Sequence, residues 1–153
     1  RRIIDVPGYN KIRLHPACRF IGTMNYGYAG TRELNAALVS RFMVIDMPPL
    51  TAETLDFLLV KMFPSMKEEA KKQFTGLFMD MQTKAYNGEI STKPLDLRGL
   101  MSAIRTIRSG LAPASAVKMG LTNKSFDIFE REIIDDIVMT RIPSTWTKTD
   151  IFN

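Results

Sequence analysis

The sequence predicts a mostly α-helical protein in which a short α/β segment, residues 1–49, precedes an all-α domain, residues 50–143. The first segment contains short apolar runs bounded by turn residues, a pattern typical of strands. From Thr51 onward, apolar residues instead recur every three or four positions, as on one face of a helix. Pro48-Pro49 separates the two patterns, and we expect the domain boundary there. Residues 144–153 are mainly polar and are expected to form a loosely held tail.

The first 49 residues carry the signals of a hairpin, two strands and a short helix. The hairpin is expected because β-prone residues 2–6 and 11–15 lie on either side of a Pro-Gly turn. Strands are expected over the apolar runs 19–24 and 42–47. Between them, residues 33–41 have the apolar spacing of a short helix.

Five helices are expected in the all-α domain. The second should begin at a capping box formed by Ser65 and Glu68. The third should begin at Asp96, an N-cap residue, and stop at Gly110, and a short fourth helix should cover residues 112–119. Each of the first three helices and the last one has an apolar stripe that is expected to face the core. The first stripe contains Leu55, Leu58, Leu59 and Met62, and the second contains Phe74, Leu77, Phe78 and Met81. The third contains Leu97, Leu100, Ile104 and Ile107, and the stripe of the last helix contains Phe126, Phe129, Ile133, Ile137 and Val138.

Composition excludes several kinds of site. One cysteine, Cys18, excludes an intrachain disulfide and a cysteine-rich zinc site, and it fits a reducing, cytoplasmic setting. One histidine, His15, excludes a histidine cluster, and Asp135-Asp136 reads as a solvated helix face, so we expect no metal site. No apolar stretch approaches about 20 residues, so no membrane partner is expected. The net charge of +5 permits an acidic partner without requiring one.

One ordered string carries a family resemblance. Residues 15–42 read HPACRFIGTMNYGYAGTRELNAALVSRF. This string resembles the sensor 1 to arginine-finger region of AAA+ ATPases of the MoxR and dynein-related branch. The resemblance implies that residues 1–49 are the C-terminal end of a P-loop α/β core and that residues 50–143 are the helical lid that follows it.

The chain has no phosphate-loop motif G-x-x-x-x-G-K-[ST], and no apolar strand ending in adjacent acidic residues precedes the hairpin. We therefore expect it to begin after the half of the module that grips the nucleotide. ATP and Mg²⁺, the cofactors that the resemblance implies, would bind through that other half. The chain alone is not expected to hydrolyse ATP.

The resemblance assigns catalytic roles to two residues. Asn25 matches sensor 1, where a carboxamide can contact the γ-phosphate or hold the attacking water. Arg41 matches the arginine finger, which would act on the nucleotide of a neighbouring subunit, and Arg32 is the competing candidate. Read locally, Asn25 is also a common turn residue, and an arginine such as Arg41 at a helix end also interacts well with the helix dipole.

Two cations are candidates for sensor 2, which contacts the ATP phosphates from the lid. The string RGLMSAIR resembles the start of the sensor 2 helix and selects Arg98. An alternative alignment, which places the sensor 2 cation nearer the front of the region, selects Lys93. The alternative reading is that both are solvated cations.

The resemblance implies a ring of identical subunits, expected to be a hexamer, that couples ATP hydrolysis to remodelling of a client protein, including chaperone-like insertion of a metal or cofactor. A ring helicase or other nucleic-acid motor is the alternative, and nucleic acid is the less favoured partner. A third reading is a non-enzymatic helical interaction module. The predicted hairpin could line the channel of a ring, because it carries an aromatic residue among cations: Arg1, Arg2, Tyr9, Lys11, Arg13 and His15.

Overall fold

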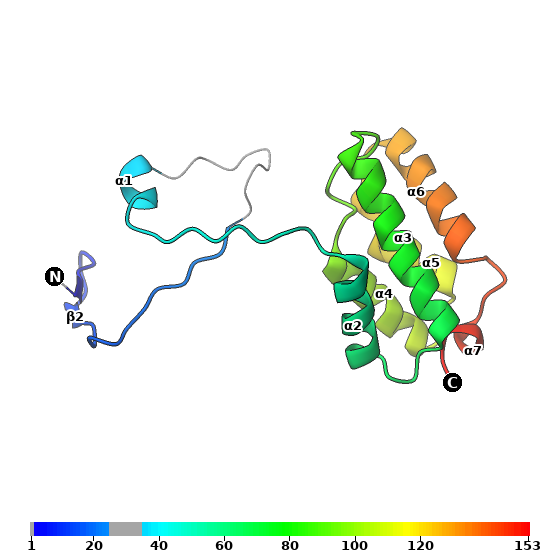
Figure 1. The fold of residues 1–153 in the computed structure, drawn as a ribbon, viewed down its shortest axis with the longest axis horizontal. Coiled ribbons are helices and arrows are strands. Elements are labelled where there is room, and N and C mark those ends of the chain that lie inside the picture. The colour runs from blue at the N-terminus through cyan, green and yellow to red at the C-terminus, as the bar shows by residue number, and fades with distance from the viewer. Residues whose placement is uncertain (1, 25–34) are drawn as a thin grey trace. The chain divides into compact units, whose positions relative to one another are not determined.

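The computed structural model describes residues 2–24 and 35–153. The chain divides between Met47 and Pro48 into two compact units, which we call the N-terminal unit, residues 1–47, and the helical unit, residues 48–153. The division lies two residues before the boundary expected from the sequence. Most of the described secondary structure is helical (Figure 1).

The N-terminal unit contains the predicted hairpin. Strand β1, Ile3–Ile4, pairs antiparallel with β2, Ile12–Arg13, with Ile4 opposite Ile12. The turn between them uses Gly8 at φ 85°, a left-handed conformation that glycine adopts without strain. Helix α1, Ala36–Val39, falls within the predicted helix and is capped by the Asn35 side chain, which accepts from the Ala37 N–H at 2.8 Å.

The two predicted strands over residues 19–24 and 42–47 are not strands in the structure. A strand requires a neighbour for its backbone hydrogen bonds, and the described part of the chain supplies none to either run. Their apolar side chains lie in solvent: Ile21 is 93% exposed and Met43 is 90% exposed. Within the described part of the N-terminal unit, these strand-like apolar runs thus have no neighbouring strand.

The helical unit contains α2, Ala52–Met62; α3, Glu68–Tyr86; α4, Leu97–Arg108; α5, Pro113–Gly120; a 3₁₀ turn η1, Thr122–Lys124; α6, Ile128–Arg141; and α7, Lys148–Ile151. Helix α3 packs against α2 and α6, and α5 packs against α4 and α6 (Figure 1). Together they enclose one apolar core, which includes fully buried Leu55, Phe74, Leu100 and Ile134.

Local caps explain several helix starts. The Thr51 hydroxyl accepts from the Thr54 N–H at the start of α2, and the Asp96 carboxylate accepts from the Arg98 N–H at the start of α4, as predicted. The predicted capping box at Ser65 is wrong, because α3 begins at Glu68 after an N-cap, Lys67, that makes no side-chain hydrogen bond.

The prediction of a loosely held tail is also wrong. Ile151 is fully buried, and the Phe152 ring packs edge-on against Phe63 with 6.4 Å between centroids. The Lys67 N–H donates to the Ile151 carbonyl at 2.8 Å, and the Asn153 N–H donates to the Ser65 carbonyl at 3.0 Å. The C-terminal residues thus close over the corner between α2 and α3.

Helix α6 is shorter than its predicted apolar stripe. It begins at Ile128, with Asp127 as its N-cap, so Phe126 lies before the helix. Phe126 is 84% exposed and Phe129 is 77% exposed, whereas Ile137 and Val138, later in the same stripe, are buried. The inward-facing part of the stripe therefore begins after Phe129.

No helix among the described residues combines the length and the apolar character that a membrane span requires.

Candidate functional site

The start of helix α4 is built around the carboxylate of Asp96. One carboxylate oxygen accepts from the Arg98 N–H at 2.9 Å, and the other forms an ion pair with Lys124. Partial burial raises the pKa of Asp96, but the hydrogen bond from Lys124 and those from the backbone of Gly99 and Arg98 outweigh it, so the pKa lies below its ordinary value. The carboxylate thus fixes the first turn of α4.

Arg98, one sensor 2 candidate, is the second residue of α4 and is exposed. Its guanidinium forms no hydrogen bond or ion pair with the described residues, and Arg105 and Arg108 on the same helix are likewise exposed and unpaired there. A guanidinium is permanently charged and can form bidentate hydrogen bonds with a phosphate. Arg98 is thus available to an anionic ligand.

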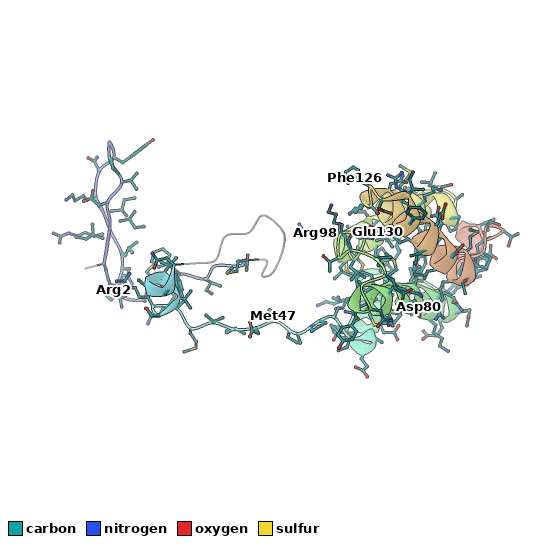
Figure 2. The ribbon with its side chains drawn as sticks, turned by 90° about the horizontal axis from the view of Figure 1, so that it is seen from above. Arg2, Met47, Asp80, Arg98, Phe126 and Glu130 are labelled. Atoms are coloured by element: carbon teal, nitrogen blue, oxygen red, sulfur yellow. The ribbon has the colours of Figure 1, made fainter. Side chains whose placement is uncertain are left out.

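Lys93, the other candidate, is already engaged. Its ammonium lies 5.6 Å from the centroid of the Phe126 ring, within the range of a cation–π contact. Phe126 itself projects from the surface of the helical unit (Figure 2). The structure therefore places Lys93 and Arg98 on the same connection into α4 but in different environments.

Glu130, on the first turn of α6, links the segment that leads into α4 to helix α6. Its Oε1 accepts from the Ser91 N–H at 2.6 Å, and its Oε2 accepts from the Ser91 hydroxyl at 3.1 Å and from the Ser125 hydroxyl. Ser125 is fully buried, and its carbonyl accepts from Arg131 Nε at 2.7 Å. A carboxylate is suited to this position because, when ionised, it only accepts hydrogen bonds.

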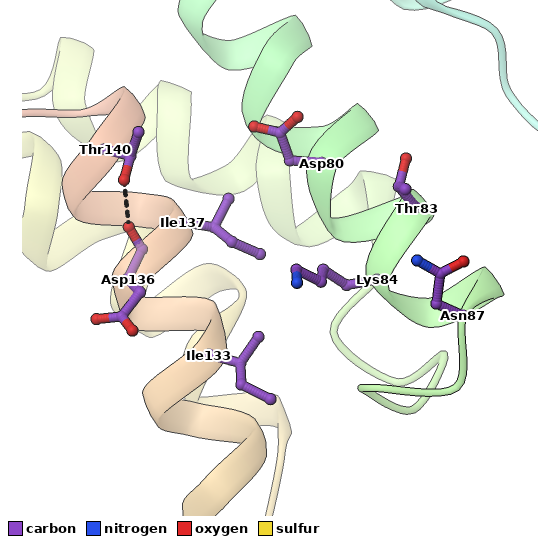
Figure 3. Close-up of a pocket in the computed structure, with 8 residues that line it drawn as sticks. All are labelled: Asp80, Thr83, Lys84, Asn87, Ile133, Asp136, Ile137 and Thr140. Atoms are coloured by element: carbon purple, nitrogen blue, oxygen red, sulfur yellow. Dashed lines mark hydrogen bonds between the residues drawn. The ribbon is translucent and has the colours of Figure 1, made fainter.

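A groove of about 460 Å³ lies between α3 and α6 (Figure 3). Ile133 and Ile137 form its apolar part, and the other lining residues are polar: Asp80, Thr83, Lys84, Asn87, Asp136 and Thr140. Asp80 is paired with Arg141 at 2.7 Å, and Lys84 with Glu89 at 2.6 Å. Most of the charge around the groove is therefore used within the helical unit.

The Asp135-Asp136 pair is divided between two environments. Asp135 pairs with Lys118 at 3.1 Å, whereas Asp136 lines the groove. No group of three metal-ligating side chains occurs among residues 2–24 and 35–153.

The two predicted catalytic residues belong to the N-terminal unit. Arg41 is exposed two residues after the end of α1, and its N–H donates to the Leu38 carbonyl at 3.0 Å. Asn25 and the competing finger candidate Arg32 lie outside the described residues.

Two of the hairpin cations have partners within the N-terminal unit. Lys11 pairs with Asp5 at 2.9 Å, and the Arg2 guanidinium donates to the carbonyl of Pro16. Arg13 and Tyr9 remain exposed, Tyr9 at 78%.

Comparison with known proteins gives relatives but no family. No family model and no solved structure matches the chain. It is 30% identical over 129 residues to the uncharacterized protein YojN of Bacillus subtilis, a match that covers 84% of this chain and 42% of YojN. It is 24% identical over 131 residues to an uncharacterized protein of Staphylococcus epidermidis, covering 86% of this chain and 48% of the relative. An uncharacterized protein of Staphylococcus aureus is 25% identical over 127 residues, with 83% and 48% covered. The chain thus spans about half the length of the curated relatives it matches.

Sequence reasoning missed the contacts that hold the start of α4. Glu130 lies 39 residues from Ser91, and Lys124 lies 28 residues from Asp96. Locally, Glu130 looks like an ordinary acidic residue in the first turn of a helix, which the helix dipole alone would explain. No local pattern identifies its long-range partner.

Proposed function

We propose that this chain is the C-terminal part of a cytoplasmic AAA+ ATPase module that couples ATP hydrolysis to remodelling of a client protein, including chaperone-like insertion of a metal or cofactor. The observation that carries the proposal is the exposure of the apolar runs 19–24 and 42–47 in the unit that precedes the helical unit along the chain. A β-prone apolar run left unpaired exposes both its backbone groups and its side chains. These runs have the properties of strands that belong to a sheet whose other strands come from another segment of the protein. In the proposed module, that segment is the nucleotide-binding half of the α/β core.

The helical unit suits the role of a lid. It has its own core, and its helix α4 starts with an exposed arginine, Arg98, that no described carboxylate neutralises. Lys93 is engaged with Phe126, so we assign the sensor 2 role to Arg98. ATP and Mg²⁺ would bind through a phosphate loop outside residues 1–153.

The length of the relatives also supports the proposal. The matched stretch covers 42% of YojN and 48% of the S. epidermidis protein. The remainder of proteins of that length has room for the half of the module that carries the phosphate loop. The same architecture predicts that residues 1–153 alone bind ATP weakly and do not hydrolyse it.

The test of this function uses Arg41→Ala in the protein that contains this chain together with its phosphate loop. The variant should bind ATP and assemble normally, yet hydrolyse it about 10³-fold more slowly, because a finger stabilises charge on the transferring phosphoryl group. Asn25→Ala should likewise retain binding and lose turnover, since a water-orienting group acts mainly on the transition state. Arg105→Ala, an exposed arginine on α4, is the matched control and should keep normal turnover.

A mixing experiment tests whether the arginine finger acts on the nucleotide of a neighbouring subunit. Arg41→Ala is combined with a variant that lacks the phosphate-loop lysine, and each is inactive alone. Mixed rings contain some interfaces with an intact lysine on one side and an intact Arg41 on the other, so part of the activity should return. If mixed rings form and no ratio restores hydrolysis, Arg41 is not the finger and Arg32 becomes the candidate. The absence of ATPase activity in the intact wild-type protein would reject the proposal and favour a helical interaction module.

A nucleic-acid motor is the second candidate. The observation that favours it is the outer surface of α4, where Arg98, Arg105 and Arg108 are exposed and the helix contains no acidic residue. Binding of duplex DNA by the intact protein, with an affinity that falls steeply as salt rises and weakens in Arg105→Ala, would support this candidate. Binding that is weak and insensitive to salt would exclude it.

A further inference from the structure

The segment that leads into α4 is held at three points, two of them on the α5–α6 connection and one on the first turn of α6. Ser91 bonds to Glu130, Lys93 stacks on Phe126, and Asp96 pairs with Lys124. The contacts follow the segment in order, at its beginning, middle and end. We call residues 91–96, with these three contacts, the α4 clamp.

Glu130 accepts more hydrogen bonds than any other residue in these contacts. Three donors meet its two carboxylate oxygens, two of them from Ser91. Hydrogen bonds to an ionised group are stronger than those between neutral groups. Ser125, the third donor, is fully buried, so the carboxylate is held by a part of the core that cannot easily move.

The clamp reaches both cations that could meet a phosphate. Lys93 lies two residues after Ser91, and Arg98 lies on the turn capped by Asp96. Releasing Ser91 would free the segment that carries Lys93 and remove one of the supports of the first turn of α4. A cation contacts a phosphate productively only when it is placed correctly to within about 1 Å. Loss of this support would therefore misplace the cations without removing them.

We propose that Glu130 is a positioning residue, which holds the α4 clamp through Ser91 and thereby orients Arg98 toward the nucleotide. The inference rests on the proposed function for its consequence in catalysis, whereas the clamp itself can be tested on the 153-residue chain. Glu130 would act through other residues and would not touch the nucleotide.

The first measurement is amide hydrogen exchange on the 153-residue chain. In Glu130→Ala the amides of Ser91, Leu95 and Asp96, which are hydrogen-bonded in the structure, should exchange about tenfold faster or more, while the core of α3 keeps its protection. Glu130→Gln, which retains one acceptor oxygen, should have a smaller effect, and Ser91→Ala should reproduce only part of it. Glu132→Ala is the control, because Glu132 is exposed on the same helix and has no side-chain partner among the described residues. Unchanged exchange in both Glu130→Ala and Ser91→Ala would overturn the inference.

The second measurement is ATP turnover in the intact protein. Glu130→Ala should raise the KM for ATP or lower kcat by about tenfold, with Glu130→Gln partly restoring it. In a background where Lys93 and Arg98 are both alanine, the same substitution should change turnover by less than about twofold, because the groups it positions are gone. A general structural defect would persist in that background.

The two proposals fail in different ways. If Arg98→Ala lowers turnover and Glu130→Ala does not, the positioning role is wrong and the proposed function stands. If Arg98→Ala does not change turnover in an active ATPase, the sensor 2 assignment is wrong, and the positioning role falls with it. An unchanged effect of Glu130→Ala in the double-alanine background also overturns the positioning role.

Discussion

Asp96 shows how one side chain can serve two structural purposes. It caps α4 through the Arg98 N–H and forms an ion pair with Lys124 on the turn after α5. The first contact is local and was predictable from the sequence. The second depends on η1 reaching the start of α4, which only the fold determines. A residue identified as a cap thus also joins two parts of the helical unit.

We expect Asp96→Ala to lower the free energy of unfolding by about 1–2 kcal/mol, because the cap and the ion pair are lost together. Asp96→Asn should lose less, since an amide oxygen still caps the helix. Urea denaturation followed by circular dichroism measures both, with Asp136→Ala as the control at an exposed carboxylate that lacks these contacts. Equal stability of Asp96→Ala and wild type would show that neither contact contributes.

Asp96 also gives the stability a defined pH dependence. Its pKa in the folded chain lies below the ordinary value of 3.8, so the folded state binds this proton less readily than the unfolded state. The stabilisation is therefore complete above 3.8 and is lost as the pH falls through the folded pKa. The difference in stability between wild type and Asp96→Asn should shrink over that acidic range, and a constant difference would contradict this assignment.

At the scale of elements, a close contact between two glycines fixes how α4 meets α5. A Cβ built on Gly99 would clash with the Gly120 carbonyl oxygen, and one built on Gly120 would lie 2.7 Å from the Gly99 carbonyl oxygen, which are separations shorter than atoms tolerate. The helices can approach this closely only because both positions lack a side chain.

We expect Gly99→Ala to destabilise the helical unit by about 1–3 kcal/mol, although alanine favours helices, because the added methyl group forces the two helices apart. Ser102→Ala, at an exposed position of the same helix, should not destabilise it. Thermal unfolding of both variants measures the difference. If Gly99→Ala proves more stable than wild type, α4 and α5 do not pack as closely as described.

The elements also show what sequence could predict. The starts of α2 and α4 were readable because Thr51 and Asp96 act within one turn. The run 42–47 was wrong as a strand because apolar sequence alone cannot supply a neighbouring strand. The stripe on α6 was extended too far, since Phe126 and Phe129 continue its spacing without facing the core. At the candidate site, the resemblance of the string RGLMSAIR makes Arg98 a candidate alongside Lys93, whereas no local signal identifies Glu130, because its partner is 39 residues away.

At the scale of the whole molecule, the described core lies entirely within residues 48–153, and its last members are Ile151 and Phe152. Phe152 also pairs with Met66 as an isolated antiparallel bridge. Local pattern does not predict this closure, because two apolar residues among polar ones form no periodic pattern. Long-range closure of the chain, more than local propensity, places them.

We expect Phe152→Ala to lower the free energy of unfolding by about 3 kcal/mol or more, because it leaves a cavity beside Phe63 and Met66. The substitution of an exposed neighbour, Thr145→Ala, is the control. Chemical denaturation with circular dichroism measures both. A loss no greater than that of the control would mean that the C-terminal residues leave the core in solution.

This closure also has a consequence for synthesis on the ribosome. Helices α2 and α3 emerge early, and the corner between them contains Phe63 and Met66. Their cover arrives only when residues 151–152 have been translated and released from the exit tunnel. Contacts between distant parts of a chain form late in folding, so this corner is the apolar surface of the helical unit that a nascent chain leaves uncovered longest. A chaperone that recognises apolar surface of the helical unit would find that corner uncovered until then.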